Sequence, residues 1–210
     1  MSTLFDDFVI ENALTRLQRV PILNYGTHMQ TLTHIGHIIR TWPATSRRLA
    51  RIMVERYGMP HEATDSLLIW HYNSPWKRTI LYRDGVPHHF PASHIDQLEQ
   101  TIEYRVPPEK CSELTSFDGS LVVDRTRGEL SAHCDSEEAN TLLLNLAHEI
   151  VIGKKTVPEA RKIHAQAVKG YRLNWPEPYA KQLQFSTASM FRDREEPTSD
   201  PDRSAPKWFS

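Results

Sequence analysis

Apolar residues recur at helical spacing over the first sixty positions of the chain. The pattern predicts three helices, at residues 5–20, 27–42 and 45–57. In the third, Leu49 and Ile52 fall three positions apart and define an apolar face. Pro21 follows the first helix and Gly58 follows the third, and both residue types favour a helix end there.

The pattern changes after residue 60 to short, β-rich apolar runs. Residues 66–72 and 77–82 are such runs, and Asn73-Ser74-Pro75 between them is typical of a turn. They predict a β-hairpin. A second hairpin is predicted from residues 120–124 and 129–133, joined by a loop at 125–128.

The segment between the two hairpins combines proline with histidine. Residues 86–91 (VPHHFP) are expected to be extended, because proline disfavours helix in the residue before it. Ser93 is a suitable cap for a short helix with Leu98 and Ile102 on its inner face. A further short helix is expected at 109–114.

Two helices are predicted near the C-terminal end of the folded part. Asp135 with Glu138, and Thr156 with Glu159, have the spacing of capping boxes. The broad apolar face of the first helix comprises Leu142, Leu143, Leu146, Ile150 and Val151. A short link at 153–155 joins the two helices, which predicts an antiparallel pair.

These elements predict an α+β fold, with N-terminal helices and a C-terminal antiparallel helix pair packed on small antiparallel hairpins or a small sheet. We expect one domain at residues 1–180, helical over 1–60 and mixed over 61–180. The expected core comprises Leu49, Ile52, Leu68, Trp70, Ile80, Leu98, Ile102, Val122, Leu143, Leu146, Ile150 and Ile163.

Residues 181–210 are expected to form a disordered tail. Between 192 and 206 the only apolar residue is an alanine, among charges and three prolines. Trp208 and Phe209 near its end are either incidental or a short hydrophobic contact for a protein partner.

The composition and net charge argue against several classes of protein. The net charge is -1 with neutral histidines, which argues against a domain-wide nucleic-acid surface. No run approaches 18 apolar residues, and the first ten residues carry Asp6 and Asp7 where a signal peptide is basic and apolar. Two cysteines, Cys111 and Cys134, are no disulfide framework. We therefore expect a cytoplasmic protein with reduced thiols.

Eleven histidines are the main anomaly of the composition. Histidine is a common metal ligand, and the candidates here are His88, His89, His94 and Asp96. In an extended segment His88 and His89 point to opposite faces, so one of them joins His94, with His71 from the first hairpin as a further neighbour. The alternative is a rigid loop whose histidines bind backbone carbonyls, because the spacing matches no established zinc motif.

Three further side chains are weaker pocket candidates. Cys134 lies where a strand is expected to run into a helix, where a thiol is either a nucleophile or an inert buried group. Asn145 and His148 share one side of a leucine-rich helix, as a buried polar pair or as a pocket lining. His148 and Glu149 do not begin an HExxH zinc motif, because position 152 is isoleucine.

The sequence leaves the function open between classes. The first hypothesis is a non-catalytic binding or accessory protein, since no P-loop, GxGxxG, GxSxG or paired CxxC motif is present. The alternative is a small enzyme with a histidine-lined pocket that uses a divalent metal. A third possibility is phosphate or nucleic-acid contact through the arginines Arg40, Arg47, Arg48, Arg51 and Arg56.

Overall fold

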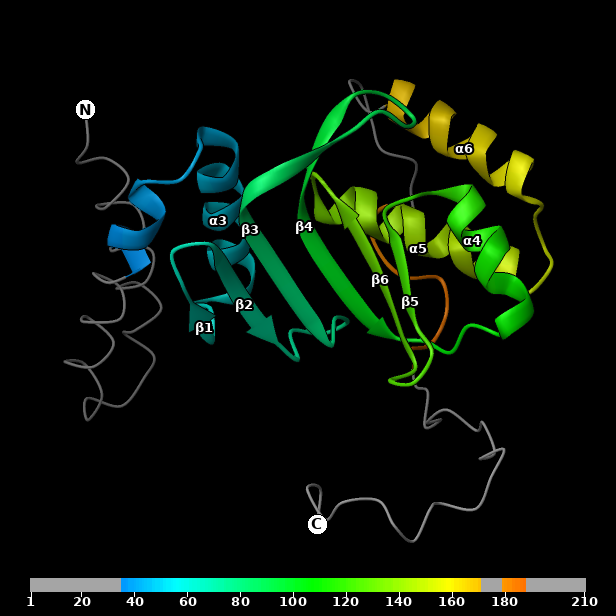
Figure 1. Cartoon of the computed structure of the whole chain (residues 1–210), viewed down its shortest axis with the longest axis horizontal. Helices are drawn as coiled ribbons and strands as arrows, with labels where there is room; N and C mark the ends of the chain where they lie inside the picture. Colours follow the sequence, from blue (N-terminus) through cyan, green and yellow to red (C-terminus); the bar gives the residue numbers. More distant parts are fainter. Residues whose placement is uncertain (1–34, 171–178, 188–210) are drawn as a thin grey trace, which may run out of the picture.

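The computed structural model describes residues 35–170 and 179–187 of the chain. At its centre is one six-stranded antiparallel sheet with the strand order β1-β2-β3-β4-β6-β5 (Figure 1). The strands are β1 (Glu62–Ala63), β2 (Leu67–His71), β3 (Arg78–His88), β4 (His94–Glu103), β5 (Leu121–Asp124) and β6 (Glu129–Cys134). Together with its helices, this sheet confirms the α+β class and both predicted hairpins.

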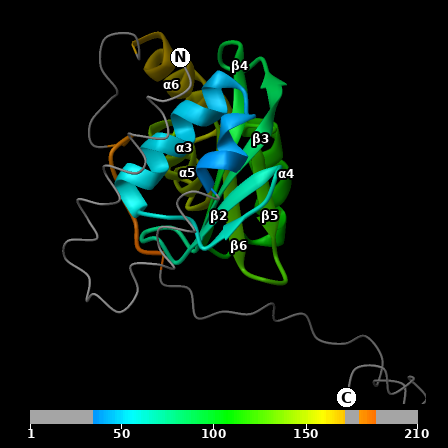
Figure 2. The same ribbon diagram turned by 90° about the vertical axis from the view of Figure 1, so that its left-hand side faces the viewer.

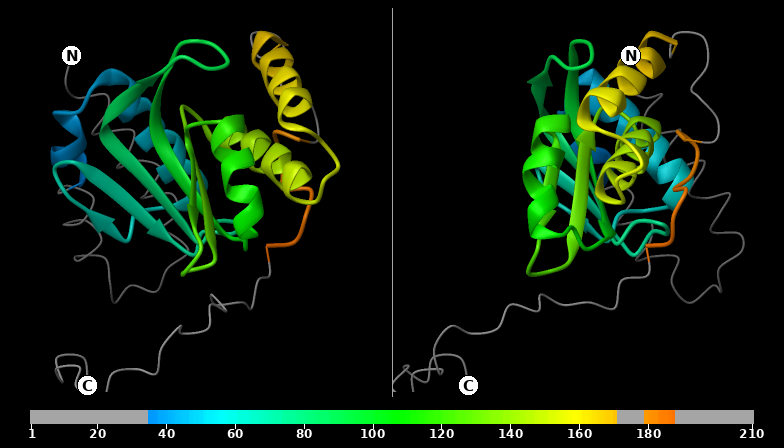
Figure 3. Two further views of the ribbon diagram at one scale, coloured as in Figure 1. Left: turned by 45° about the vertical axis from the view of Figure 1, so that its right-hand side comes forward. Right: turned by 90° about the vertical axis from the view of Figure 1, so that its right-hand side faces the viewer.

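The helices gather on one face and one edge of the sheet. They are a helical stretch at 35–40, α3 (Ala44–Tyr57), the 3₁₀ helix η2 (Pro108–Lys110) running into α4 (Cys111–Phe117), α5 (Glu137–Val151) and α6 (Val157–Gly170). In Figures 1 and 2, α3 and α5 lie on the same face, while α4 lies at the β5 edge. α6 turns back across α5 and also packs on α4 (Figure 3).

The helix predicted at 5–20 and the first part of the one at 27–42 lie outside the described residues. Among the helices that are described, none combines the length and the apolar character needed to cross a bilayer.

Strand β4 carries the hydrophobic core from one half of the sheet to the other. Leu98 belongs to the cluster under α3, and Ile102 belongs to the cluster under α5. Both side chains are fully buried. Because side chains alternate along a strand, residues 94, 96, 98, 100 and 102 all share this helix-covered face.

The helix predicted from Ser93 is therefore wrong, since this segment is β4. The prediction relied on Leu98 and Ile102, which are four positions apart. That spacing returns a side chain to the same side of a helix and also to the same face of a strand. Pairing with β3 and β6 decides between the two, because both edges of β4 find partners.

Most of the predicted core is confirmed, with one clear error. Val122 is 57% exposed, because Leu121 and Val123 take the inward side of the edge strand β5. Ile52, Ile80 and Ile163 are only partly buried. The remaining predicted core residues are buried, namely Leu49, Leu68, Trp70, Leu98, Ile102, Leu143, Leu146 and Ile150.

The sequence predicted the N-terminal cap of α6 correctly but not that of α5. Ser136, not Asp135, caps α5, and its Oγ accepts the Ala139 N–H at 3.4 Å. Glu159 accepts the Thr156 N–H at 2.8 Å, as the second capping box predicts.

Residues 179–187 lie against α5, so the predicted tail boundary at 180 falls inside a segment in contact with the domain. The Asn145 side chain donates to the carbonyls of Tyr179 and Gln182, and Phe185 stacks on His148. The remainder of the tail, including Trp208 and Phe209, lies outside the described residues.

An irregularity in the β3–β4 pairing sets the position of the hairpin end. Leu81 pairs with Leu98, but Val86 already pairs with Asp96, so residues 82–85 lie opposite Gln97 alone. Such bulges bend a strand and redirect the side chains beyond them. Beyond this one, the hairpin curves over the core toward α6 (Figure 1).

Gly85 is required inside this bulge. A Cβ there would overlap the side chains of Ile95 and Gln97 and approach the Asp96 carbonyl oxygen to 2.8 Å. We therefore expect Gly85→Ala to lower the free energy of unfolding, measured by urea denaturation, by about 1–3 kcal/mol. Gly119→Ala is the matched control, because nothing lies within 4 Å of its Cβ position. Equal stabilities of the two variants would contradict this account of the bulge.

Candidate metal centre

Strand pairing brings two histidines and one aspartate together at the end of the β3–β4 hairpin. His88 on β3 is the direct partner of His94 on β4. Asp96 lies two residues beyond His94 and so shares its face of the sheet. His88, His94 and Asp96 each offer one ligand atom, and these atoms lie within 4.8 Å of one another.

His89 does not join this group. It follows His88 in the chain, it is exposed, and its Nδ1 lies 3.2 Å from the Ser93 hydroxyl. The sequence left open which of the two neighbours faces His94. The strand register decides it, because only His88 stands directly opposite His94.

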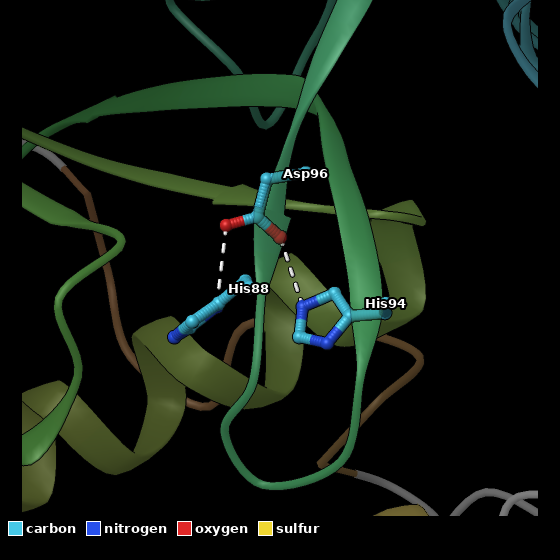
Figure 4. A group of neighbouring side chains, drawn as sticks. All are labelled: His88, His94 and Asp96. Carbon is cyan, nitrogen blue, oxygen red and sulfur yellow. Dashed lines mark ion pairs between the residues drawn. The ribbon is translucent and has the colours of Figure 1, made fainter.

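The Asp96 carboxylate lies between the two imidazoles (Figure 4). Its Oδ1 is 2.8 Å from His94 Nε2, and its Oδ2 is 3.2 Å from His88 Nδ1. The Asp96 side chain is 5% exposed, against 15% for His94 and 21% for His88. The carboxylate is thus buried behind two histidines that still reach the surface.

A backbone carbonyl fixes the orientation of His94. Its Nδ1 lies 2.7 Å from the carbonyl oxygen of Ala92, which can only accept a hydrogen bond. Nδ1 therefore carries a proton, and Nε2 is directed toward Asp96. A histidine held in this way through one nitrogen and presenting the other is the usual arrangement of a metal ligand.

The loop at residues 118–120, between α4 and β5, contacts the cluster of His88, His94 and Asp96. The Ser120 hydroxyl donates to Asp96 Oδ2 at 2.5 Å and lies 3.1 Å from His88 Nδ1. The Ser120 N–H donates to Asp118 Oδ1 at 2.9 Å. That same oxygen is 3.8 Å from His88 Nε2, so the His88 ring lies between two carboxylates.

Asp118 also faces a histidine from α6. Its Oδ2 is 3.7 Å from His164 Nδ1, and the two side chains are 1% and 3% exposed. Within the described part of the chain, neither atom has a hydrogen-bond partner. His164 is otherwise enclosed by the rings of Phe90 and Phe117.

The charges in this cluster are unevenly compensated. The close contact with the Asp96 carboxylate raises the pKa of His94 to about 9. Burial opposes ionisation of Asp96, but the contact with His94 and the hydrogen bond from Ser120 outweigh it and lower the pKa of that carboxyl. Burial raises the pKa of Asp118 and lowers the pKa of His164 to about 4.

Of the weaker candidates, only Cys134 reaches this cluster. Its Sγ lies 3.4 Å from His94 Nε2. His71 lies on β2 and pairs with Glu62 at 2.5 Å. Asn145 holds the backbone of residues 179–184, and His148 Nδ1 lies 2.8 Å from the Tyr104 hydroxyl. His71, Asn145 and His148 therefore make structural contacts away from the end of the β3–β4 hairpin.

Three residues of the site were missed from the sequence, namely Asp118, Ser120 and His164. Asp118 lies just before the second predicted hairpin and Ser120 is the first residue of that hairpin, and neither position carries a signal for a site. His164 did carry a signal, because it falls at helical spacing between Ala160 and Ala167, which are both buried on the inner face of α6. A histidine in the apolar face of a helix marks a buried polar contact.

Comparisons with known proteins add no assignment to this geometry. No protein-family model, no curated protein and no solved structure matches the chain.

Two histidines of the site predict how the stability of the metal-free protein varies with pH. The pKa of His94 is raised from 6.5 to about 9, so its contribution is complete below pH 6.5 and is lost as pH rises through 9. The pKa of His164 is lowered from 6.5 to about 4, so stability also falls as pH drops from 6.5 toward 4.

We therefore expect the free energy of unfolding, measured with a chelator present, to be greatest near pH 6.5. The alkaline decline should be roughly 2 kcal/mol, a value that already includes the reduction due to the partial exposure of His94. In His94→Gln the decline between pH 6.5 and about 8 should disappear, because the thiol and tyrosines titrate only above that range, while the acid decline remains. A wild-type profile that is flat above pH 6.5 would show that the His94–Asp96 pair contributes nothing.

Proposed function

We propose that this protein binds a divalent transition-metal ion through His88, His94 and Asp96. The observation that carries the proposal is the buried Asp96 carboxylate, which faces an imidazole nitrogen with each of its oxygens. Its Oδ1 makes no hydrogen bond of ordinary geometry in the described residues, although His94 Nε2 is 2.8 Å away. A cation bound between Asp96 Oδ1 and His94 Nε2 would give both atoms a partner.

The charge around the site supports the same proposal. Asp96 and Asp118 are both buried, and a buried carboxylate is stable only when it is paired, protonated or bound to a metal. The two imidazoles that face Asp118, those of His88 and His164, stay 3.8 and 3.7 Å from its oxygens, beyond hydrogen-bond distance, and burial disfavours a charge on His164 by lowering its pKa. A divalent ion beside His88 would offset this second carboxylate.

The donor atoms favour some ions over others. Imidazole nitrogen suits zinc, iron, nickel and copper, whereas magnesium and calcium prefer sites built from oxygen. With bonds of about 2.0–2.2 Å, two donors 2.8–3.2 Å apart can share one ion after small adjustments. The proton on His94 Nε2 would leave as the metal enters.

The proposed role is that of a metal-binding accessory protein, and a metal-dependent enzyme is the second candidate. Three protein ligands with a position left for water are typical of catalytic zinc sites, and this observation favours the enzyme. Two histidines with one carboxylate are also found in iron oxygenases. The two roles differ in whether a fourth protein ligand closes the coordination shell.

Metal content tests the proposal directly. We expect untagged protein, purified without chelator, to contain one equivalent of zinc, iron or nickel by mass spectrometry. His88→Ala should weaken metal binding in a competition titration about 100-fold, because it removes a ligand. His89→Ala is the matched control, since His89 is the neighbouring residue and faces away. Absence of bound metal in the folded wild type, or equal losses in the two variants, would refute the site.

Asp118 is expected to act on the metal through His88. If His88 binds the ion through Nδ1, its Nε2–H faces Asp118 Oδ1, and such a carboxylate orients a ligating histidine. Asp118→Asn keeps the shape and should weaken metal affinity about 10-fold. Asp124→Asn, on β5, pairs with Arg127 and should leave affinity unchanged. Wild-type affinity in Asp118→Asn would exclude this role.

A further inference from the structure

We infer that the thiolate of Cys134 is the fourth ligand of the proposed metal site, which makes it a closed tetrahedral site for an ion of the zinc class. The inference rests on the proposed function and specifies its coordination. It is carried by the placement of Cys134 in the sheet and by the distance of its sulfur from His94.

Sheet register places Cys134 on the correct face. Cys134 is the last residue of β6 and pairs with Leu98 on β4. Directly paired residues project to the same side of a sheet, so Cys134 shares the face of Leu98 and therefore of Asp96 and His94. Beyond Cys134 the chain leaves the sheet for α5, and this leaves the sulfur at the rim, next to the hairpin end.

The separation of sulfur and nitrogen fits two ligands of one ion. Cys134 Sγ lies 3.4 Å from His94 Nε2. Zinc binds histidine nitrogen at about 2.0–2.1 Å and cysteine sulfur at about 2.3 Å. Bonds of these lengths that span 3.4 Å meet at about 100°, close to the tetrahedral angle. A metal at that point would bind the same nitrogen that faces Asp96.

A second, independent feature points to a ligand here. Asp96 Oδ1 lies 2.8 Å from the same His94 nitrogen, it belongs to a side chain that is 5% exposed, and within the described residues it makes no hydrogen bond of ordinary geometry. Two buried donors, one sulfur and one oxygen, thus converge on the nitrogen of His94.

The proposed donors balance the charge of a divalent ion, because one thiolate and one carboxylate together carry two negative charges. The sulfur is buried, with Cys134 7% exposed. Thiolate favours zinc, cobalt and iron over magnesium and manganese.

A coordination shell closed by four protein ligands favours one of the two proposed roles. Four protein ligands leave no position for an activated water, which is the pattern of structural zinc sites. Cys134 as a ligand therefore favours the metal-binding accessory protein over the metal-dependent enzyme. Such a site would hold the end of the β3–β4 hairpin to β6.

Cobalt(II) titration of the full chain distinguishes these arrangements. The thiolate should produce an intense sulfur-to-cobalt charge-transfer band in the near ultraviolet, together with visible d–d bands of tetrahedral strength. Cys134→Ser should lose the charge-transfer band and bind cobalt at least about 10-fold more weakly. Cys111→Ser is the matched control, because Cys111 lies at the start of α4 and its thiol contacts the Pro107 carbonyl.

The outcomes separate this inference from the proposal on which it rests. Visible cobalt bands without a charge-transfer band would mean a metal site that lacks Cys134, which overturns the inference and leaves the proposed function intact. No cobalt, zinc or nickel binding would overturn both. Should Cys134→Ser fail to fold, X-ray absorption of the zinc-loaded wild type decides, because a zinc–sulfur shell at about 2.3 Å is required.

Discussion

The pairing of β3 with β4 is the constraint on which the rest of the structure depends. β4 lies between β3 and β6, and its helix-covered face carries both the apolar residues of the core and the polar residues of the site. Leu98 and Ile102 join the two hydrophobic clusters, while His94 and Asp96 continue the same face beyond them. The core therefore fixes the position of the site, since one strand belongs to both.

The bulge at residues 82–85 makes this continuity possible. Without the extra residues on β3, the hairpin would continue in the plane of the core strands. With them, the end of the hairpin bends over the core and meets the α4–β5 loop and α6. At this bent end, Ser120 and Asp118 contact His88, and His164 contacts Asp118 and the Phe90 ring. Metal binding at the hairpin end would in turn stabilise the bent conformation.

Two buried carboxylates within one cluster of histidines lower the stability of the folded protein unless their charge is compensated. Asp96 is compensated by His94, but Asp118 faces its histidines at distances too long for hydrogen bonds. Hydrophobic packing around Phe90 and Phe117 holds these groups in place despite that cost. The same features support the proposed metal site, and the position of Cys134 indicates which class of ion it would take.

The sequence by itself determined the local elements of this protein. Its periodicities predicted α3, α5, α6, both hairpins and the α+β class, and its histidine pattern named His88, His94 and Asp96 as candidates. It did not separate His88 from His89, identify β4 as a strand, or bring Cys134 and His164 to the hairpin. Those outcomes depend on which strands pair and in which register. Local spacing reflects the period of one element, whereas contacts between residues 40 or more positions apart are decided only when the elements pack.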